Sequence, residues 1–265
     1  MVKVLVAGKG GVGKTSVAAA MSLILSGRGF SVVAVDADSV PNLAQSLGIP
    51  YDRASRIVPI ARDDRLIAER TGVAPGTGWG AIFKLNPRVD DLLDRYGVAV
   101  RENLRLVVLG GIDASKQGCM CPAIALARRF LRHTLRRREV VVVDSEAGAE
   151  VFGRGLAENF DLAVVVCEPT VKSVLIGVDM VRMAGELGVR ESVIVVNKAR
   201  DREAAARLLD ELAAHVRYRH VIGFDEELPK LEYEGRGLTE LGPDSVFIRD
   251  VEALVDKYVV GLLED

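Results

Sequence analysis

The N-terminal end of the chain passes from an apolar, β-branched run at 2–7 directly into the glycine-rich octapeptide GKGGVGKT at 8–15. The octapeptide fits the pattern G-x-x-x-x-G-K-[S/T], in which backbone amides between a strand and a helix close around phosphate oxygens. In such a loop a lysine charge faces the β- and γ-phosphates, and a hydroxyl faces Mg²⁺. The pattern therefore predicts a P-loop whose nucleotide-binding residues are Gly10, Gly11, Val12, Gly13, Lys14, Thr15 and Ser16.

The hydrophobic pattern of the rest of the chain indicates the fold in which this loop lies. Runs such as VVVVD at 140–144 and LAVVVC at 162–167 are apolar almost throughout, as in parallel strands that are covered on both faces. Strands are expected at 2–7, 32–36, 104–109, 140–144, 162–167 and 192–197, and helices at 14–27, 122–137, 172–187, 202–214 and 247–263. This alternation predicts an α/β fold with a doubly wound, mostly parallel sheet and helices on both faces. We expect a single domain over 1–265, with an irregular insertion at about 50–103.

Composition and charge indicate the cellular compartment and the kinds of partner to expect. The chain has 265 residues, three cysteines and a formal net charge of −2, which gives no overall attraction to nucleic acid or to a membrane surface. Three cysteines do not make a disulfide framework. No apolar run has membrane-spanning length, and the first residues enter the expected strand without room for a signal peptide. We expect a cytoplasmic protein with neither a membrane nor a nucleic acid as partner.

Lys9, the second residue of the loop, adds a more specific signal. The resulting string K-G-G-V-G-K-T is the deviant Walker A signature, and it resembles that of the MinD/ParA/nitrogenase-iron-protein superclass. The resemblance implies ATP-dependent dimers in which Lys9 reaches the partner's phosphates and stabilises the charge of the transition state, as an arginine finger does. The alternative is an exposed loop lysine without a catalytic role.

Carboxylates at the ends of two expected strands complete this resemblance. Carboxyl ends of parallel strands face the ligand crevice of an open sheet, although a lone strand-end aspartate is often only a cap. By resemblance Asp38 would orient the attacking water, so Lys9, Lys14 and Asp38 are the expected catalytic residues. Thr15, Asp36 and Asp144 are the expected magnesium residues, and Gly148 is expected to sense the γ-phosphate.

The stretch NKARD at 197–201 bears on the choice of base. It is similar to the guanine-reading N-K-x-D, but Asp201 arrives one residue late, which would direct its carboxylate away from a guanine edge. In the superclass the asparagine matching Asn197 contacts adenine. The stretch therefore favours ATP over GTP.

Two of the three cysteines, Cys119 and Cys121, form a C-x-C that is followed directly by Pro122. Pro122 suits the first position of a helix, and a helix N-terminus favours thiolate. One such pair seldom completes a metal site within one chain, and two small packing residues are the alternative. The dimer that Lys9 implies would bring four sulfurs together, a set that suits tetrahedral Zn²⁺ or square-planar Ni²⁺.

Further motifs narrow the resemblance to one subgroup. K-G-G-V-G-K-T, V-D-A-D, L-N-P-R-V-D-D-L-L-D-R-Y-G at 85–97, G-C-M-C-P and D-S-E-A-G at 144–148 occur in this order. Together they resemble the CooC-type nickel-insertion ATPases that mature carbon monoxide dehydrogenase and acetyl-CoA synthase. The resemblance implies a homodimer that binds nickel through Cys119 and Cys121 of both subunits and delivers it to one of these enzymes at the expense of ATP. The basic run at 128–138 is either a solvated face or a docking surface for an acidic client.

Two other functions remain open at this level. One is a spatial-organising ATPase of the MinD or ParA type. Such proteins use a basic amphipathic membrane helix or a basic DNA-binding surface, whereas the segment 250–265 carries acidic residues at its polar positions. The other is an iron–sulfur carrier ATPase, whose usual C-x-x-C near the C-terminus does not occur here.

Overall fold

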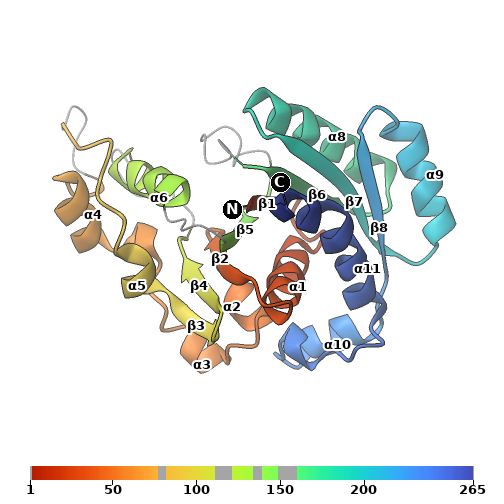
Figure 1. Ribbon diagram of the computed structural model, residues 1–265, viewed down its shortest axis with the longest axis horizontal. Helices are drawn as coiled ribbons and strands as arrows, with labels where there is room; N and C mark the ends of the chain where they lie inside the picture. Colours follow the sequence, from red (N-terminus) through yellow and green to blue (C-terminus); the bar gives the residue numbers. More distant parts are fainter. Residues whose placement is uncertain (1, 77–81, 111–120, 134–138, 149–159, 265) are drawn as a thin grey trace.

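A computed structural model describes residues 2–76, 82–110, 121–133, 139–148 and 160–264 (Figure 1). Its centre is an eight-stranded sheet with the order β3-β4-β2-β5-β1-β6-β7-β8. All neighbouring strands pair in parallel except β3, which runs antiparallel to β4 at one edge. The strands are β1 (Val2–Gly8), β2 (Ser31–Ala37), β3 (Val98–Arg101), β4 (Leu104–Val108), β5 (Glu139–Ser145), β6 (Leu162–Cys167), β7 (Glu191–Ala199) and β8 (Tyr218–Gly223).

Helices cover both faces of the sheet, as the uniformly apolar strands predict. The helices are α1 (Lys14–Gly27), α2 (Leu43–Ser46), α3 (Tyr51–Ala54), α4 (Asp64–Thr71), α5 (Leu92–Tyr96), α6 (Cys121–His133), α8 (Val171–Glu186), α9 (Arg202–Leu212), α10 (Glu227–Tyr233), α11 (Val246–Val255) and α12 (Gly261–Glu264). Short helical turns lie at η1 (Ile60–Arg62) and η2 (Leu238–Glu240), and η3 (Asp256–Val260) is a π-helical turn that continues α11. The predicted fold class is confirmed.

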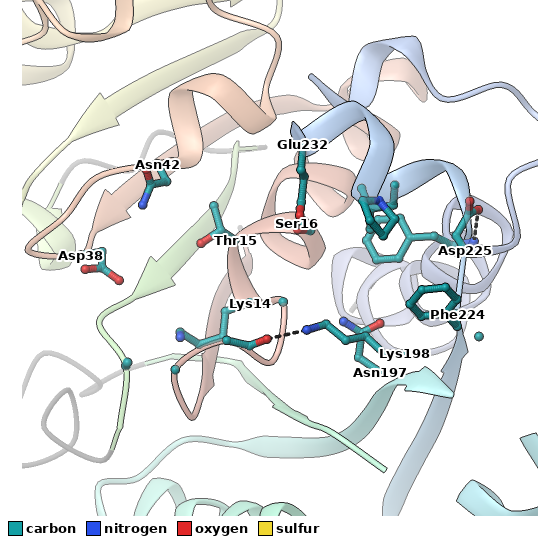
Figure 2. A pocket seen from close by; sticks show the side chains of 18 residues that line it. Lys14, Thr15, Ser16, Asp38, Asn42, Asn197, Lys198, Phe224, Asp225 and Glu232 are labelled. Atoms are coloured by element: carbon teal, nitrogen blue, oxygen red, sulfur yellow. Dashed lines mark hydrogen bonds between the residues drawn. The ribbon is translucent and has the colours of Figure 1, made fainter. Parts of the chain in front are cut away.

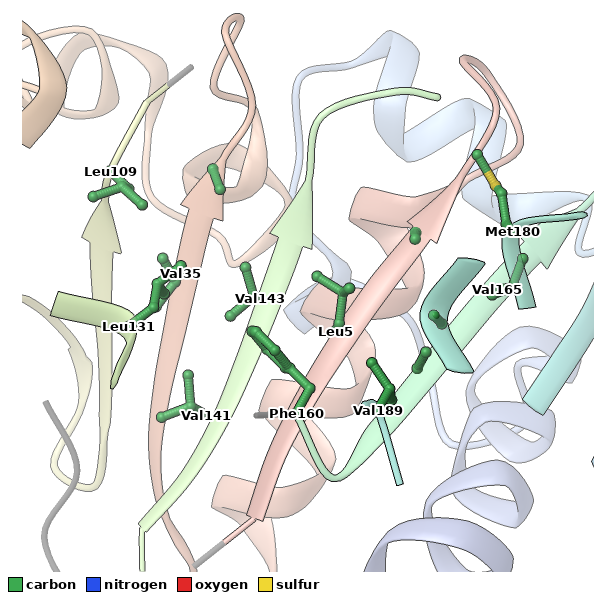
Figure 3. Close-up of a cluster of buried hydrophobic side chains, with 14 of the residues drawn as sticks. Leu5, Val35, Leu109, Leu131, Val141, Val143, Phe160, Val165, Met180 and Val189 are labelled. Atoms are coloured by element: carbon green, nitrogen blue, oxygen red, sulfur yellow. The ribbon is translucent and has the colours of Figure 1, made fainter. Parts of the chain in front are cut away.

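Two buried clusters form the core, one on each side of the sheet. Successive strand residues point to opposite faces, so Leu5 packs into one cluster while Val4 and Val6 pack into the other. The first cluster joins the sheet to α4, α5, α6, α8 and α9, and Figure 3 shows part of it around Leu5 and Phe160. The second cluster joins the sheet to α1, α2 and α11. Large apolar side chains are therefore buried in both layers.

The six expected strands and five expected helices are present. The helix at 14–27 and the strand at 162–167 have the expected bounds, and the ends of the others are shifted. β8 was not expected, and neither were the helices within 50–103. The expected helix at 122–137 is described as α6, and 134–138 lie outside the described residues. No helix in the described part of the chain is long and apolar enough to cross a membrane.

The segment at 50–103, expected to be irregular, forms α3, α4, α5 and the edge strand β3. The Arg70 guanidinium donates to both carboxylate oxygens of Asp91, at 2.8 and 2.6 Å, and so ties α4 to the residue that precedes α5. The Tyr96 hydroxyl donates to Asp63 at 2.6 Å, and Asp63 in turn caps α4 by accepting from the Leu66 amide. Because α4 packs against α6, this segment positions the helix that begins at Cys121.

Candidate functional site

A cavity of about 510 Å³ lies over the P-loop and extends to α10 and the end of β8 (Figure 2). Its walls come from five regions. These are the P-loop and the start of α1, the loop after β2, the segment after β5, the end of β7, and the segment that follows β8. The first four lie at the carboxyl ends of parallel strands, where ligands of open α/β sheets bind.

The P-loop takes a conformation that depends on two of its glycines. Gly13 has φ 94°, and a Cβ there would lie 2.5 Å from the Asn197 Nδ2. A Cβ on Gly8 would lie 2.3 Å from the Val166 carbonyl oxygen. Side chains at these positions would push the loop away from β6 and β7. The glycines are therefore required by close packing as well as by backbone geometry.

Lys14 begins α1, and no side chain caps this helix N-terminus. The first amides of the helix are thus free to bind phosphate oxygens, which the helix dipole also favours. Lys14 is only 6 % exposed, and its Nζ donates to the Lys9 carbonyl oxygen at 3.3 Å. Burial lowers the pKa of Lys14, while the nearby Asp144 and Asp38 carboxylates act in the opposite direction. Lys9 itself is exposed, as a residue that reaches a second subunit must be.

Asp144 and Thr15 form a polar pair that fits a magnesium ion. The Thr15 hydroxyl donates to Asp144 Oδ2 at 2.6 Å, and Asp144 is 1 % exposed. Asp144 Oδ1 is buried and has no hydrogen-bond partner among the residues that the structure describes. Burial and the neighbouring Asp36 carboxylate raise the pKa of Asp144 to about 7. A buried, unpaired carboxylate oxygen beside a hydroxyl is the oxygen donor set that Mg²⁺ prefers.

Asp36 lies directly opposite Asp144 in the β2–β5 register and is fully buried. Both of its oxygens accept from backbone amides, Oδ1 from Asp38 at 3.1 Å and Oδ2 from Leu43 at 2.9 Å. Burial raises the pKa of Asp36 to about 6 despite these bonds. Asp36 therefore fixes the loop that carries Asp38 and lies beside Asp144. Its role as a magnesium residue stays a prediction.

The remaining predicted phosphate-side residues surround this centre. Asp38 is half-buried and lines the cavity, and its Oδ1 accepts from the Val40 amide at 2.9 Å. The Gly148 amide donates to the Gly8 carbonyl at 3.0 Å, so the segment after β5 closes onto the P-loop. The residues that follow, 149–159, lie outside the described part of the chain.

At the base end of the cavity, Asn197 is 2 % exposed and its Nδ2 donates to the Val12 carbonyl at 2.9 Å. Asn197 therefore braces the P-loop, and its contact with adenine stays a prediction. Asp201 caps α9 by accepting from the Ala204 amide at 2.9 Å, and it does not line the cavity. This use of its carboxylate agrees with the sequence argument that Asp201 does not read guanine.

Two groups of site residues were missed by the sequence analysis. Lys198 has φ 62°, and its Nζ donates to the Gly11 carbonyl at 2.6 Å, so this side chain crosses to the P-loop. The sequence signal for Lys198 was the Asn-Lys dipeptide at the end of a strand. The sequence analysis used this dipeptide only to choose between adenine and guanine. The second group lines the cavity from α10 onward, where no sequence motif marked it. Its members are Leu228, Pro229, Glu232 and Phe247.

The predicted transition-metal residues can be placed only in part. α6 begins at Cys121, which is half-buried, one residue before the expected start at Pro122, so the proline lies in the first turn. Cys119 lies outside the described residues. Within the described residues there is no group of three or more histidine, cysteine, aspartate or glutamate side chains arranged to hold a metal. Binding of nickel or zinc between subunits therefore stays a prediction.

The fold and this cavity together define a P-loop protein that binds a nucleotide. Comparison with known proteins narrows this class. Residues 3–238 match the family described as the CobQ/CobB/MinD/ParA nucleotide binding domain. An ATP-binding protein of Methanocaldococcus jannaschii is 39 % identical over 264 residues, which cover 98 % of each chain. The carbon monoxide dehydrogenase accessory protein CooC of Rhodospirillum rubrum is 37 % identical over 242 residues, or 91 % of this chain and 90 % of that protein.

Solved structures agree with the fold. A ParA family ATPase from Chlorobium tepidum superimposes with a TM-score of 0.67 at 16 % identity and covers 94 % of this chain and 96 % of its own. The cell division protein MinD of Aquifex aeolicus gives 0.64 at 21 % identity, with 97 % of each chain covered. The chain belongs to the CobQ/CobB/MinD/ParA nucleotide-binding family and, within it, to the CooC-type ATPases.

Proposed function

We propose that this protein is an ATP-dependent homodimeric metallochaperone. It binds one nickel ion through Cys119 and Cys121 of both subunits and inserts it into carbon monoxide dehydrogenase or acetyl-CoA synthase. The observation that carries the proposal is the sequence similarity, over nine-tenths of the chain, to a carbon monoxide dehydrogenase accessory protein. The C-x-C that ends at the start of α6 supports it, because cysteine thiolates are the soft ligands that suit such a metal.

The residues in and beside the cavity would carry out ATP hydrolysis. The backbone amides at the start of α1 bind the phosphates, and Lys14 holds the negative charge of the γ-phosphate from within the cavity. Asp38 orients a water molecule for in-line attack, and Lys9 of the second subunit adds charge once the dimer closes. Thr15 and Asp144 would hold Mg²⁺, which neutralises charge on the β- and γ-phosphate oxygens. Catalysis therefore depends on dimer closure, and turnover in isolation is expected to be slow.

The order of elements along the chain supports a coupling between nucleotide binding and nickel binding. α6, which begins at Cys121, leads into β5, and β5 is followed directly by the Gly148 segment that bonds to the P-loop. Asp144 lies on the same strand. The proposed metal residue Cys121, the proposed magnesium residue Asp144 and the proposed γ-phosphate sensor Gly148 therefore follow one another along α6 and β5. A structural change caused by the nucleotide at Gly148 would be transmitted through β5 and α6 to the metal site.

A membrane-organising role of the MinD type is less well supported. Such a role uses an amphipathic helix with a free apolar face. In this structure the apolar side chains of α11 and η3 are buried against α1 and β8, with Val251, Leu254 and Val259 all 0 % exposed. The helix is therefore part of the core.

The proposal is tested by reconstituting nickel-dependent activation of nickel-free carbon monoxide dehydrogenase. Wild-type protein with ATP and Ni²⁺ should activate the enzyme, while Lys14→Ala and Cys121→Ser should each fail. Cys167→Ala is the matched cysteine control and should retain activation, because Cys167 is buried in the core on β6. Full activation by Cys121→Ser would refute the metallochaperone proposal and leave the ATPase assignment in place.

A further inference from the structure

The short helix α10 covers one side of the nucleotide cavity with a mixed face. Leu228, Pro229 and Glu232 all line the cavity, and the spacing of 228 and 232 by four residues places them on one helical face. The two apolar residues are followed, one turn later, by the carboxylate. Figure 2 shows Glu232 extending from α10 toward Ser16. Nothing in the hydrolytic mechanism uses this carboxylate.

Glu232 makes one hydrogen bond to the P-loop helix. The Ser16 hydroxyl donates to Glu232 Oε1 at 3.0 Å, and Ser16 is 6 % exposed in the first turn of α1. Oε2 has no hydrogen-bond partner among the described residues. Glu232 itself is exposed, so its second oxygen is accessible to a ligand in the cavity.

The position of Ser16 determines which part of a nucleotide would lie beside Glu232. The free amides at the start of α1 bind the phosphates, and the opposite end of the cavity, at Asn197 and Phe224, is where the base is expected. The sugar must lie between these ends, next to Ser16 and beneath α10. A carboxylate in this position would repel a phosphate, but it is a strong acceptor for two neighbouring hydroxyl groups.

We propose that Glu232 binds the ribose hydroxyls of the nucleotide and selects ribonucleotides over deoxyribonucleotides. In the structure the Ser16 hydroxyl donates to one of its oxygens. When a nucleotide binds, its ribose hydroxyls donate to Glu232 Oε2 and compete with the Ser16 hydroxyl for Oε1. The inference rests on the adenine-nucleotide binding of the proposed function, and it is independent of nickel and of the client.

The test compares the dissociation constants of ADP and 2′,3′-dideoxy-ADP for the full-length protein by calorimetry. Wild-type protein should bind ADP about tenfold more tightly than the dideoxy compound, as expected for hydrogen bonds to a charged group. Glu232→Gln keeps an oxygen that can accept from Ser16 but loses the charge, so the ratio should fall to about threefold. Glu232→Ala should bring it close to one. Glu227→Gln, on the same helix, should keep the wild-type ratio, because Glu227 pairs with Lys230.

Inosine diphosphate separates a sugar contact from a base contact. If Glu232→Gln changed the ratio of ADP to inosine diphosphate and left the ribose ratio unchanged, Glu232 would read the base and the inference would be overturned. An unchanged ribose ratio in Glu232→Ala would likewise overturn it, because Glu232 would then serve only to hold Ser16. If the Glu232 variants lose the preference for ADP over the dideoxy compound, the inference stands, even where the protein does not activate the client enzyme. A wild-type protein without affinity for ADP would overturn both proposals.

Discussion

At the scale of single residues, the site places two buried carboxylates side by side, where a bound cation would neutralise their charge. Asp36 and Asp144 face each other on adjacent strands, and each has a pKa raised chiefly by burial, to about 6 and about 7. Asp36 is held by two backbone amides, whereas Asp144 keeps one oxygen unpaired. The first residue thus organises the loop, and the second is available to a cation.

Asp38 provides a residue-scale prediction. Asp38→Ala removes the group expected to orient the attacking water, while the phosphate-binding amides and Lys14 are untouched. The variant should bind ATP, hydrolyse it at least about 100-fold more slowly than wild type, and accumulate as the ATP-bound dimer. Phosphate release and size-exclusion chromatography with ATP measure the two effects. Asp52→Ala, an exposed residue on α3, is the control. Equal turnover in Asp38→Ala and wild type would remove Asp38 from the mechanism.

Cys167 provides a second prediction at this scale, on pH dependence. Burial raises the pKa of the Cys167 thiol to about 12, and the residue is 1 % exposed. At pH 8 the thiolate, which is the reactive form, is then roughly one ten-thousandth of the total. Iodoacetamide should therefore not modify Cys167 in the native protein between pH 7 and 9, and it should do so after unfolding in guanidinium. Mass spectrometry of digested protein measures this. Rapid native labelling at pH 8 would show that Cys167 is accessible and could compete for metal.

At the scale of secondary structure, the segment at 50–103 acts as a support for α6. Val89 and Leu92 from its second half share a core cluster with Ala123 and Leu126 of α6. The bidentate Arg70–Asp91 pair holds the two halves of the segment together. The motif at 85–97 therefore serves packing against the helix that starts at Cys121.

Arg70→Ala tests this support. The Arg70 side chain is 10 % exposed and Asp91 is 41 % exposed, so loss of the pair should lower the free energy of unfolding by about 1–2 kcal/mol. Amide exchange should also accelerate in α6. The matched control is Arg88→Ala, whose partner Asp90 lies in the same motif. Both side chains are more than 60 % exposed, so the free energy of unfolding should not change measurably. Equal effects of the two variants on α6 would contradict the proposed support.

The elements that the sequence predicted, and those it did not, differ in a physical way. β5 and β6 are valine-rich because both of their faces are buried, and such runs identify strands without further context. β8 is an edge strand whose first four residues are only half-buried, so its sequence YRHVIG lacks this signature. α10 is seven residues long and contains Pro229. Short, half-exposed elements depend on tertiary contacts, and Glu232 was missed because it lies on one of them.

At the scale of the whole molecule, one chain supplies the P-loop, the predicted magnesium residues Thr15 and Asp144, and the cavity wall at Asn197 where the base is expected. Lys9 is exposed and its Nζ makes no hydrogen bond in the described structure, which leaves it for a second subunit. The nucleotide-binding half was predictable because the P-loop motif is local and its glycines are fixed by packing. The metal half stays a prediction, because the proposed site needs two copies of a segment whose Cys119 lies outside the described residues.

The central claim is that two subunits share one metal ion, and native mass spectrometry of nickel-loaded protein tests it most directly. The account predicts a dimer with one Ni²⁺ and a monomer with none. Cys119→Ser and Cys121→Ser should each lose the metal and the metal-dependent dimer, since either change removes two of four sulfurs, while ATP binding survives. One nickel ion on each isolated chain, or nickel retained at full affinity in both serine variants, would contradict the account.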